Sequence, residues 1–328
     1  MAPPRFLSTL LAMLPPASPL ALLPSLTSLT AAAAPVLTSS PAAAAALHLC
    51  IGGVAGSAGA LSVYPLDLIK TRLQSEEGKA RFANGLEAAR DVLAHDGPLG
   101  FFHGVSTQLV GVAPEKAIKL SVYAAVSGAA CWHGAVPLHG QVLAGWLAGL
   151  SQTVVTNPLE VVKVRMQLGG GRAGELLREL RWGGLYTGLE ATALRDSTFS
   201  AILFPINEHI KPLLLSQLGA DHAFFCSLLA GMIAATPAAF LTTPADLVKT
   251  RMQQGRELLL AQQGACVPGF APPPSFGAVA AQVLREEGAA TFFDGCAERV
   301  ARSAPQFGVT LAMLDLMNDF CLAHGLAL

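Results

Sequence analysis

Long apolar segments alternate with shorter polar segments along most of the chain. Three apolar segments, residues 42–66, 135–159 and 223–245, contain no Asp, Glu, Lys or Arg. A helix needs about 20 predominantly apolar residues to cross a bilayer. These three segments are therefore candidate transmembrane helices, and a very apolar soluble core is the alternative.

Each candidate runs into a polar stretch that precedes a second apolar segment. This order predicts six long helices, at residues 45–74, 105–130, 139–168, 188–216, 222–254 and 296–322. Residues 75–97 and 276–289 carry apolar residues at helical spacing with charges between them, which predicts short amphipathic helices on the membrane surface. The predicted fold class is an all-α membrane protein.

Small residues recur four positions apart in the first, third and fifth of these helices. The pairs are Gly52 and Gly56, Gly145 and Gly149, and Gly231 and Ala235. Small side chains let helix backbones approach closely where lipid supplies no hydrophobic driving force. We expect these positions to lie at contacts between helices.

Composition supports a membrane protein and excludes several function classes. Hydrophobic residues make up 52% of the chain and charged residues 13%, against about a quarter charged in an average soluble domain. A net charge of −1 offers no basic surface for nucleic acid. The His and Cys residues are dispersed, and there is no nucleophile elbow or phosphate loop, so we expect no enzyme, metal or cofactor.

Residues 1–44 differ from the rest of the chain. They are rich in Ala, Leu, Pro, Ser and Thr, with no acidic residue and a single basic residue, Arg5. Frequent prolines argue against a stable helix. A targeting segment and a disordered segment both remain open, although a mitochondrial presequence should contain more arginine.

A ten-residue pattern occurs three times, each time at the end of an odd-numbered helix. It reads PLDLIKTRLQ from Pro65, PLEVVKVRMQ from Pro158 and PADLVKTRMQ from Pro244. The copies are roughly 90 residues apart, which is too long for a solenoid repeat of 20 to 50 residues. Each copy therefore belongs to a module of its own, and we place the modules at residues 45–131, 138–216 and 221–322.

Every copy places an acid and a base one turn apart inside a membrane helix, where a charge is costly unless it faces water or a partner. If three modules surround an axis, the acid of one helix can pair with the base of the next: Asp67 with Lys163, Glu160 with Lys249, and Asp246 with Lys70. We expect this ring to act as a gate, braced by Gln74, Gln167 and Gln253, with the three prolines bending the helices inward. Bases that only anchor helix ends at the interface are the alternative.

The threefold pattern Pro-x-[Asp/Glu]-x-x-[Lys/Arg]-x-[Lys/Arg]-x-Gln, followed by acid-Gly and aromatic-x-Gly motifs, resembles the mitochondrial carrier family, solute carrier family 25. The likeness covers residues 45–322. It implies a six-helix pseudo-threefold barrel, a monomer in the mitochondrial inner membrane that alternates between cytosol-open and matrix-open states, with membrane lipid such as cardiolipin as a partner. The ring described above would be the matrix gate. A plastid or other organelle membrane remains open as the location.

The resemblance also implies a second ring near the cytosolic end of the even-numbered helices. Of the matching positions here, only Lys211 and Asp315 can form an ion pair. We therefore expect a weak cytosolic gate and a resting cavity that is open at that end.

Charged residues gather at the middle of the even-numbered helices, where the family binds substrate. The candidates are Glu115, Lys116, Arg195, Asp196 and Arg302. Arginine is well suited to clamp carboxylates, and an acid is needed for a substrate ammonium. Neighbours in a helix do not face each other, so we expect Arg195 and Asp196 to have separate partners. Arg299 and Lys119 could instead lie on helix-packing faces.

The stretches LVGVAPEKAIKL, TPADLVKTR and RSAPQFGVTL resemble the aspartate/glutamate carriers within this family. That resemblance implies exchange of aspartate for glutamate, with a proton accompanying glutamate. Such carriers in animals bear EF-hand domains, and no D-x-[DN]-x-[DN]-G loop occurs in these 328 residues, so calcium regulation is not expected. Glutamate/proton symport, carriage of another amino acid, and a carrier-like binding protein without transport remain as alternatives.

Overall fold

The computed structural model describes the backbone of residues 41–74, 84–103, 105–131, 136–169, 186, 189–263 and 276–324. Within these ranges the side chains of 41–44, 70–74, 107, 159–169, 220 and 253–263 are not described. The side chains of six residues from the predicted gate and its brace therefore lie outside the description: Lys70, Gln74, Glu160, Lys163, Gln167 and Gln253.

Six long α-helices make up most of the described chain. They are α3 (Pro41–Gln74), α6 (Val105–Ala129), α7 (Leu138–Gly169), α9 (Leu189–Leu218), α10 (Ala223–Gln263) and α12 (Cys296–Ala323). Two shorter helices, α5 (Gly85–His95) and α11 (Phe276–Glu286), lie where amphipathic helices were predicted. Short 3-10 turns are η2 (Pro98–Phe102), η3 (Ala220–His222) and η4 (Ala290–Phe293). The predicted helices are confirmed, except that α10 continues well past residue 254.

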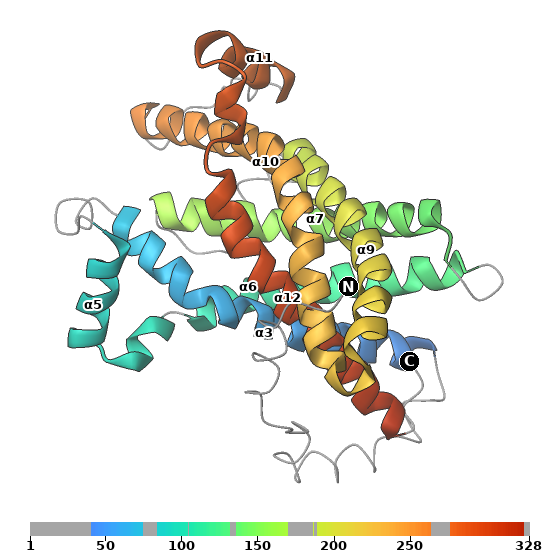
Figure 1. Ribbon diagram of the computed structural model, residues 1–328. Coiled ribbons are helices and arrows are strands. Elements are labelled where there is room, and N and C mark those ends of the chain that lie inside the picture. The colour runs from blue at the N-terminus through green and yellow to red at the C-terminus, as the bar shows by residue number, and fades with distance from the viewer. Residues whose placement is uncertain are drawn as a thin grey trace, which may run out of the picture.

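The six long helices contact one another in a closed cycle. Each packs against the long helix before it and the one after it in the chain, and α12 returns to pack against α3 (Figure 1). The two short helices stand apart from this cycle, with α5 beside α3 and α11 beside α10. Such a cycle surrounds a central space, and side chains from non-neighbouring helices can meet there.

Within the part of the chain that the structure describes, two helices are long and apolar enough to cross a membrane by length and composition, at Ala45–Ile69 in α3 and Ala223–Met252 in α10. The third candidate, residues 135–159, is not one of them. Within α7 the polar residues His139, Gln141, Gln152 and Asn157 lower the mean hydropathy. Composition of a single helix therefore marks fewer spans than the sequence pattern suggested.

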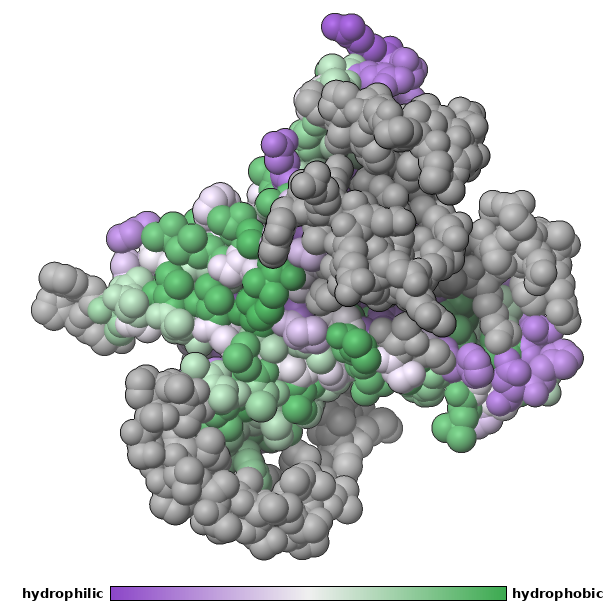
Figure 2. Space-filling model, turned by 180° about the vertical axis from the view of Figure 1, so that it is seen from behind, coloured by the Kyte–Doolittle hydropathy of each residue, from purple (hydrophilic) through white to green (hydrophobic). Residues whose placement is uncertain are grey.

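Large apolar side chains point outward from the long helices. Figure 2, which shows the side opposite to the view of Figure 1, has hydrophobic residues over much of the described surface. Exposed examples on α3, α7 and α10 include Val54, Leu143, Trp146, Ile233 and Leu241. An outward apolar surface of this extent is what helices facing lipid present, whereas a soluble protein rarely exposes a patch of this size.

The small residues in α3, α7 and α10, the first, third and fifth long helices, do lie at close helix contacts. A Cβ atom added at Gly145 would stand 2.5 Å from the Ser200 carbonyl oxygen on α9, and one at Gly149 would overlap the Asp196 carbonyl. A Cβ atom at Gly231 would stand 2.9 Å from Gly308 Cα on α12. The prediction that these positions bring helix backbones together is confirmed, and it explains how the charged residues of α9 and α12 are set against their neighbours.

Each of the three repeat prolines lies inside a long helix: Pro65 in α3, Pro158 in α7 and Pro244 in α10. Proline removes one backbone hydrogen bond and favours a bend. Figure 1 shows α10 changing direction along its length. The bend carries the C-terminal part of α10 toward α11 and away from the core.

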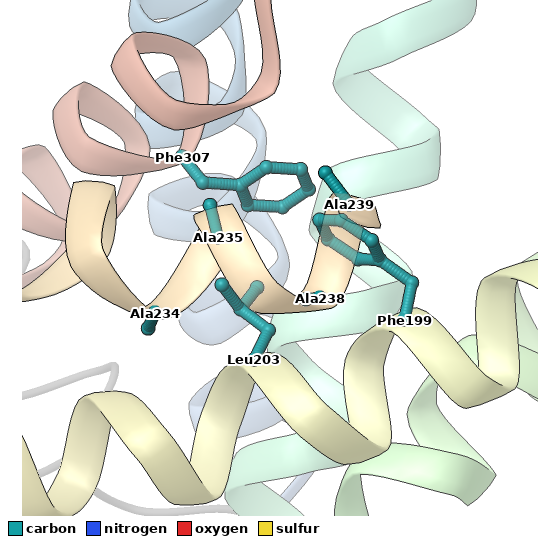
Figure 3. Close-up of a cluster of buried hydrophobic side chains, with 7 residues drawn as sticks. All are labelled: Phe199, Leu203, Ala234, Ala235, Ala238, Ala239 and Phe307. Carbon is teal, nitrogen blue, oxygen red and sulfur yellow. The ribbon is translucent and has the colours of Figure 1, made fainter. Parts of the chain in front are cut away.

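The largest buried cluster joins three helices at the middle of the molecule. Figure 3 shows Phe199 of α9 and Phe307 of α12 pointing toward each other beside the alanines of α10. Their ring centroids lie 4.8 Å apart at an interplanar angle of 41°. Alanine on α10 leaves room for both rings, so the three helices close around an aromatic pair.

Candidate functional site

A cavity of about 730 Å³ opens between α6, α9, α10 and α12. All five residues proposed from the sequence as substrate contacts line it: Glu115, Lys116, Arg195, Asp196 and Arg302. They come from α6, α9 and α12, the second, fourth and sixth long helices, which are far apart in the sequence. The structure therefore brings together every member of the predicted set.

One end of the cavity is buried and the other is exposed. Lys119, Phe199 and Phe307 line the inner end and are at most 8% exposed. Thr250 and Asp294 line the other end and are exposed. The mouth thus lies at the end of the helix cycle where the repeats occur.

Apolar side chains fill the space beyond the inner end. Tyr123 and Phe204 stack with ring centroids 3.8 Å apart, within a cluster that includes Leu120 and Leu311. Farther along, Lys211 Nζ lies 2.7 Å from Asp315 Oδ2, the one pair that the sequence allowed at this end. The role of that pair as a gate remains a prediction.

The expectation of a cavity open at the Lys211–Asp315 end is wrong for this structure, because the described cavity opens at the opposite end. The sequence argument counted ion pairs and left out apolar packing. A stacked aromatic pair adds about 0.5–1.5 kcal/mol beyond its buried area. The apolar layer can therefore close this end with a single ion pair.

Arg195 contacts two carboxylates at once. Its Nε lies 2.7 Å from Asp196 Oδ1, and its Nη1 lies 3.1 Å from Asp246 Oδ1 on α10. The expectation that Arg195 and Asp196 would have separate partners is wrong, because the long arginine side chain turns along the helix surface to reach α10 and passes its neighbour. Thr153 Oγ1 of α7 donates to Asp196 Oδ2 at 3.3 Å.

Arg302 is held by the first of the repeat acids. Its Nε and Nη2 lie 2.7 and 2.9 Å from the two carboxylate oxygens of Asp67 on α3, a bidentate arrangement. Gln108 Nε2 is 3.4 Å from the same carboxylate. Asp67 has at least one further interaction. A proposed gate acid and a proposed substrate arginine therefore share one contact.

Arg299 joins the cavity although the sequence left open a packing role for it. Its Nη1 lies 3.0 Å from Asp246 Oδ2, and its guanidinium also donates to the carbonyl and hydroxyl oxygens of Thr242. Arg299 therefore fixes α12 against α10 and adds its guanidinium to those of Arg195 and Arg302 in the cavity. Its place one turn before Arg302 on α12 is the sequence signal that could have selected it.

The carboxylate of Glu115 is neutralised within its own surroundings. Lys116 Nζ lies 2.9 Å from Glu115 Oε1, and Gln152 Nε2 of α7 donates to the same oxygen at 3.1 Å. Gln152 is 3% exposed. Glu115 is thus linked to α7 as well as lining the cavity, and Gln152 is a contact that sequence reasoning missed.

The proposed matrix gate is only partly described. Of its members, Asp67 and Asp246 hold cavity arginines, as above, and Lys249 is buried on α10 and has further interactions. The other bases and acids of the ring have side chains outside the description. The ring itself remains a prediction.

Comparison with known proteins matches the chain to one family along most of its length. The model of the family described as "Mitochondrial carrier protein" matches residues 42–130, 134–218 and 220–325. Each match covers one of the three segments that contain the repeated pattern. The relatives found are consistent with this match.

Three relatives illustrate the similarity. The human "Electrogenic aspartate/glutamate antiporter SLC25A12, mitochondrial" is 42% identical over 291 residues, covering 84% of this chain and 41% of that protein. The mouse "Electrogenic aspartate/glutamate antiporter SLC25A13, mitochondrial" is 40% identical over 290 residues, with the same coverage of both chains. The "Probable calcium-binding mitochondrial carrier K02F3.2" of Caenorhabditis elegans is 38% identical over 292 residues, covering 83% of this chain and 38% of that one.

The chain spans about two fifths of the length of these relatives. The similarity nevertheless extends through all six long helices and the cavity between them. On the threefold family match and the identity of about 40% to these relatives, the chain belongs to the mitochondrial carrier protein family.

Proposed function

We propose that this chain is an alternating-access carrier that exchanges aspartate for glutamate. The observation that carries the proposal is the cavity in which three guanidinium groups, those of Arg195, Arg299 and Arg302, stand among carboxylates. An acidic amino acid has two carboxylates and one ammonium group, so it needs both kinds of partner. The names of the related antiporters point to the same substrates.

The finer architecture is part of the proposal. The closed cycle of six helices supports a pseudo-threefold barrel of six membrane spans, with repeats at 45–131, 138–216 and 221–322 after the segment 1–44. We place it as a monomer in the mitochondrial inner membrane, with cardiolipin as a candidate lipid and no catalytic activity. In this arrangement the cavity mouth faces the matrix.

The cavity arginines and the lysines of the proposed matrix gate would compete for the same acids. Arg302 contacts Asp67, and Arg195 and Arg299 contact Asp246. Substrate carboxylates that bind these arginines would release both acids from the arginines and leave them to the lysines of the matrix gate. Binding would thereby favour closure of the mouth, because it changes the relative energy of the two states.

The direct test is exchange in liposomes that contain the purified full chain. Labelled aspartate is supplied outside, with glutamate, aspartate, malate, ATP or nothing inside. We expect uptake only with glutamate or aspartate inside. Arg302→Ala should abolish this uptake, whereas Arg251→Ala, at the mouth and held by Glu287 at 2.8 Å, should retain most of it.

Other outcomes would select the alternatives. Uptake of labelled glutamate into empty liposomes, driven by a proton gradient, would indicate symport. Uptake exchanged only against a different amino acid would change the substrate. Thermal stabilisation by acidic amino acids without any uptake would indicate a binding protein that does not transport.

A further inference from the structure

A second buried lysine lies one turn beyond Lys116 on α6, at the inner end of the cavity. Lys119 is 2% exposed and lines the cavity together with Phe199 and Phe307. Its Nζ lies 5.5 Å from the centroid of each of these two rings. An ammonium group at this depth is costly unless it has partners.

The partners of Lys119 differ from those of the other cavity cations. Arg195, Arg299, Arg302 and Lys116 each contact a carboxylate at 3.1 Å or less. Across the side chains that the structure describes, Lys119 has no hydrogen bond or ion pair of this kind, only the faces of two rings. Cation–π contacts offset part of the cost of burial and leave the three N–H donors of the ammonium available to an acceptor in the cavity.

The surroundings of Lys119 match the side chain of an acidic amino acid. The α-carbon of such a substrate carries a carboxylate and an ammonium side by side, which fits the adjacent Arg195 and Asp196. Its side chain is one or two methylene groups ending in a carboxylate. The aromatic pair offers an apolar floor for methylene groups (Figure 3). Lys119 offers a cation beside that floor.

We propose that Lys119 binds the side-chain carboxylate of the substrate and so determines the preference for acidic amino acids over their amides. This inference rests on the proposed function and assigns a residue outside the set that the sequence selected. Phe199 and Phe307 form the floor of the subsite. Lys116, on the same helix, lies 4.7 Å from the Phe307 centroid, but its ammonium is already neutralised by Glu115.

The test compares aspartate with asparagine, which differ only in the charge of the side chain. Stabilisation of the detergent-solubilised full chain against heat is titrated with each amino acid, and the readout is the half-maximal concentration of asparagine divided by that of aspartate. In Lys119→Met we expect this ratio to fall by about ten-fold or more, because aspartate loses an ionic contact that asparagine never had. Lys119→Arg should keep the ratio near that of the unmodified chain.

The control variant is Arg251→Met, which removes a cation that Glu287 holds at the mouth of the cavity. It should leave the asparagine-to-aspartate ratio within about two-fold, since a loss of general cavity charge affects both ligands through the α-carboxylate they share. An unchanged ratio in Lys119→Met, or an equal fall in Arg251→Met, overturns the assignment. If Lys119→Met fails to fold, Lys119→Gln is read by the same criterion.

The readout separates this inference from the transport proposal. If the liposomes show no exchange of acidic amino acids, the proposed function fails, and the ratio in Lys119→Met still decides the subsite. If neither amino acid stabilises the unmodified chain, both proposals fail. Exchange with an unchanged ratio would leave the carrier function standing and remove Lys119 from substrate recognition.

Discussion

The contact between Asp67 and Arg302 makes an unusual prediction, namely that removing a charge from the cavity strengthens substrate binding. The Asp67 carboxylate accepts from two nitrogens of the Arg302 guanidinium, Nε and Nη2. A substrate carboxylate must displace it. Asp67→Asn keeps the size of the side chain and removes its charge, so we expect aspartate to bind more tightly.

The size of the effect follows from the geometry. A hydrogen bond to a charged group contributes about 1.5–3 kcal/mol, and the Asp67–Arg302 contact has two. Arg302 is 50% exposed and Asp67 only 16%, so solvent screening reduces the gain. A net value of about 1–2 kcal/mol corresponds to a Kd for aspartate that is about 5- to 30-fold lower. Exchange should become slower at the same time, because Asp67 is also a proposed gate acid.

The assay measures thermal stabilisation by aspartate for affinity and liposome exchange for turnover. Asp294→Asn is the control, because it removes the same charge from the exposed mouth of the cavity, where solvent screens it from the arginines. We expect its affinity to change by less than about two-fold. Weaker aspartate binding in Asp67→Asn, or equal tightening in Asp294→Asn, would refute the idea that Asp67 competes with substrate for Arg302.

Three further changes test other parts of the structure. Gly149→Ala places a methyl group against the Asp196 carbonyl and should lower the free energy of unfolding by about 1–3 kcal/mol or more. Gly111→Ala, whose methyl group meets nothing within 4 Å, should not lower it. Thermal unfolding in detergent compares the two variants, and equal midpoints would contradict the close α7–α9 contact. Arg195→Lys loses the fork that joins Asp196 and Asp246, so aspartate exchange should fall at least about ten-fold, and near-normal exchange would show that a point charge is sufficient. Tyr123→Ala should open the apolar layer, which is tested in a chain whose own cysteines are replaced and that carries a cysteine at Gln306. A thiol reagent added on the Lys211 side should modify that cysteine about ten-fold faster. A larger effect of Lys211→Ala would instead make the ion pair the main closure.

The sequence by itself determined the helices and the residues available to the cavity. Apolar runs between polar stretches fixed six long helices, because a membrane requires every backbone group to be paired within its own segment. Small residues at spacing four marked the helix contacts at Gly145, Gly149 and Gly231, because only residues of that size permit the backbone distances observed. Charges inside apolar helices marked Arg195, Asp196 and Arg302, because their burial is costly without a partner.

The tertiary structure alone decided which of these charges meet. Spacing along one helix fixes the direction of a side chain only on that helix, whereas a partner across the cavity depends on the rotation and tilt of six helices and on the state of the gates. Arg302 and Asp67 are 235 positions apart, and no local pattern pairs them. The long Arg195 side chain reaches Asp196, although adjacent positions on a helix point in different directions. The apolar layer around Tyr123 and Phe204 closes the end of the cavity at the Lys211–Asp315 pair, which a count of ion pairs left open.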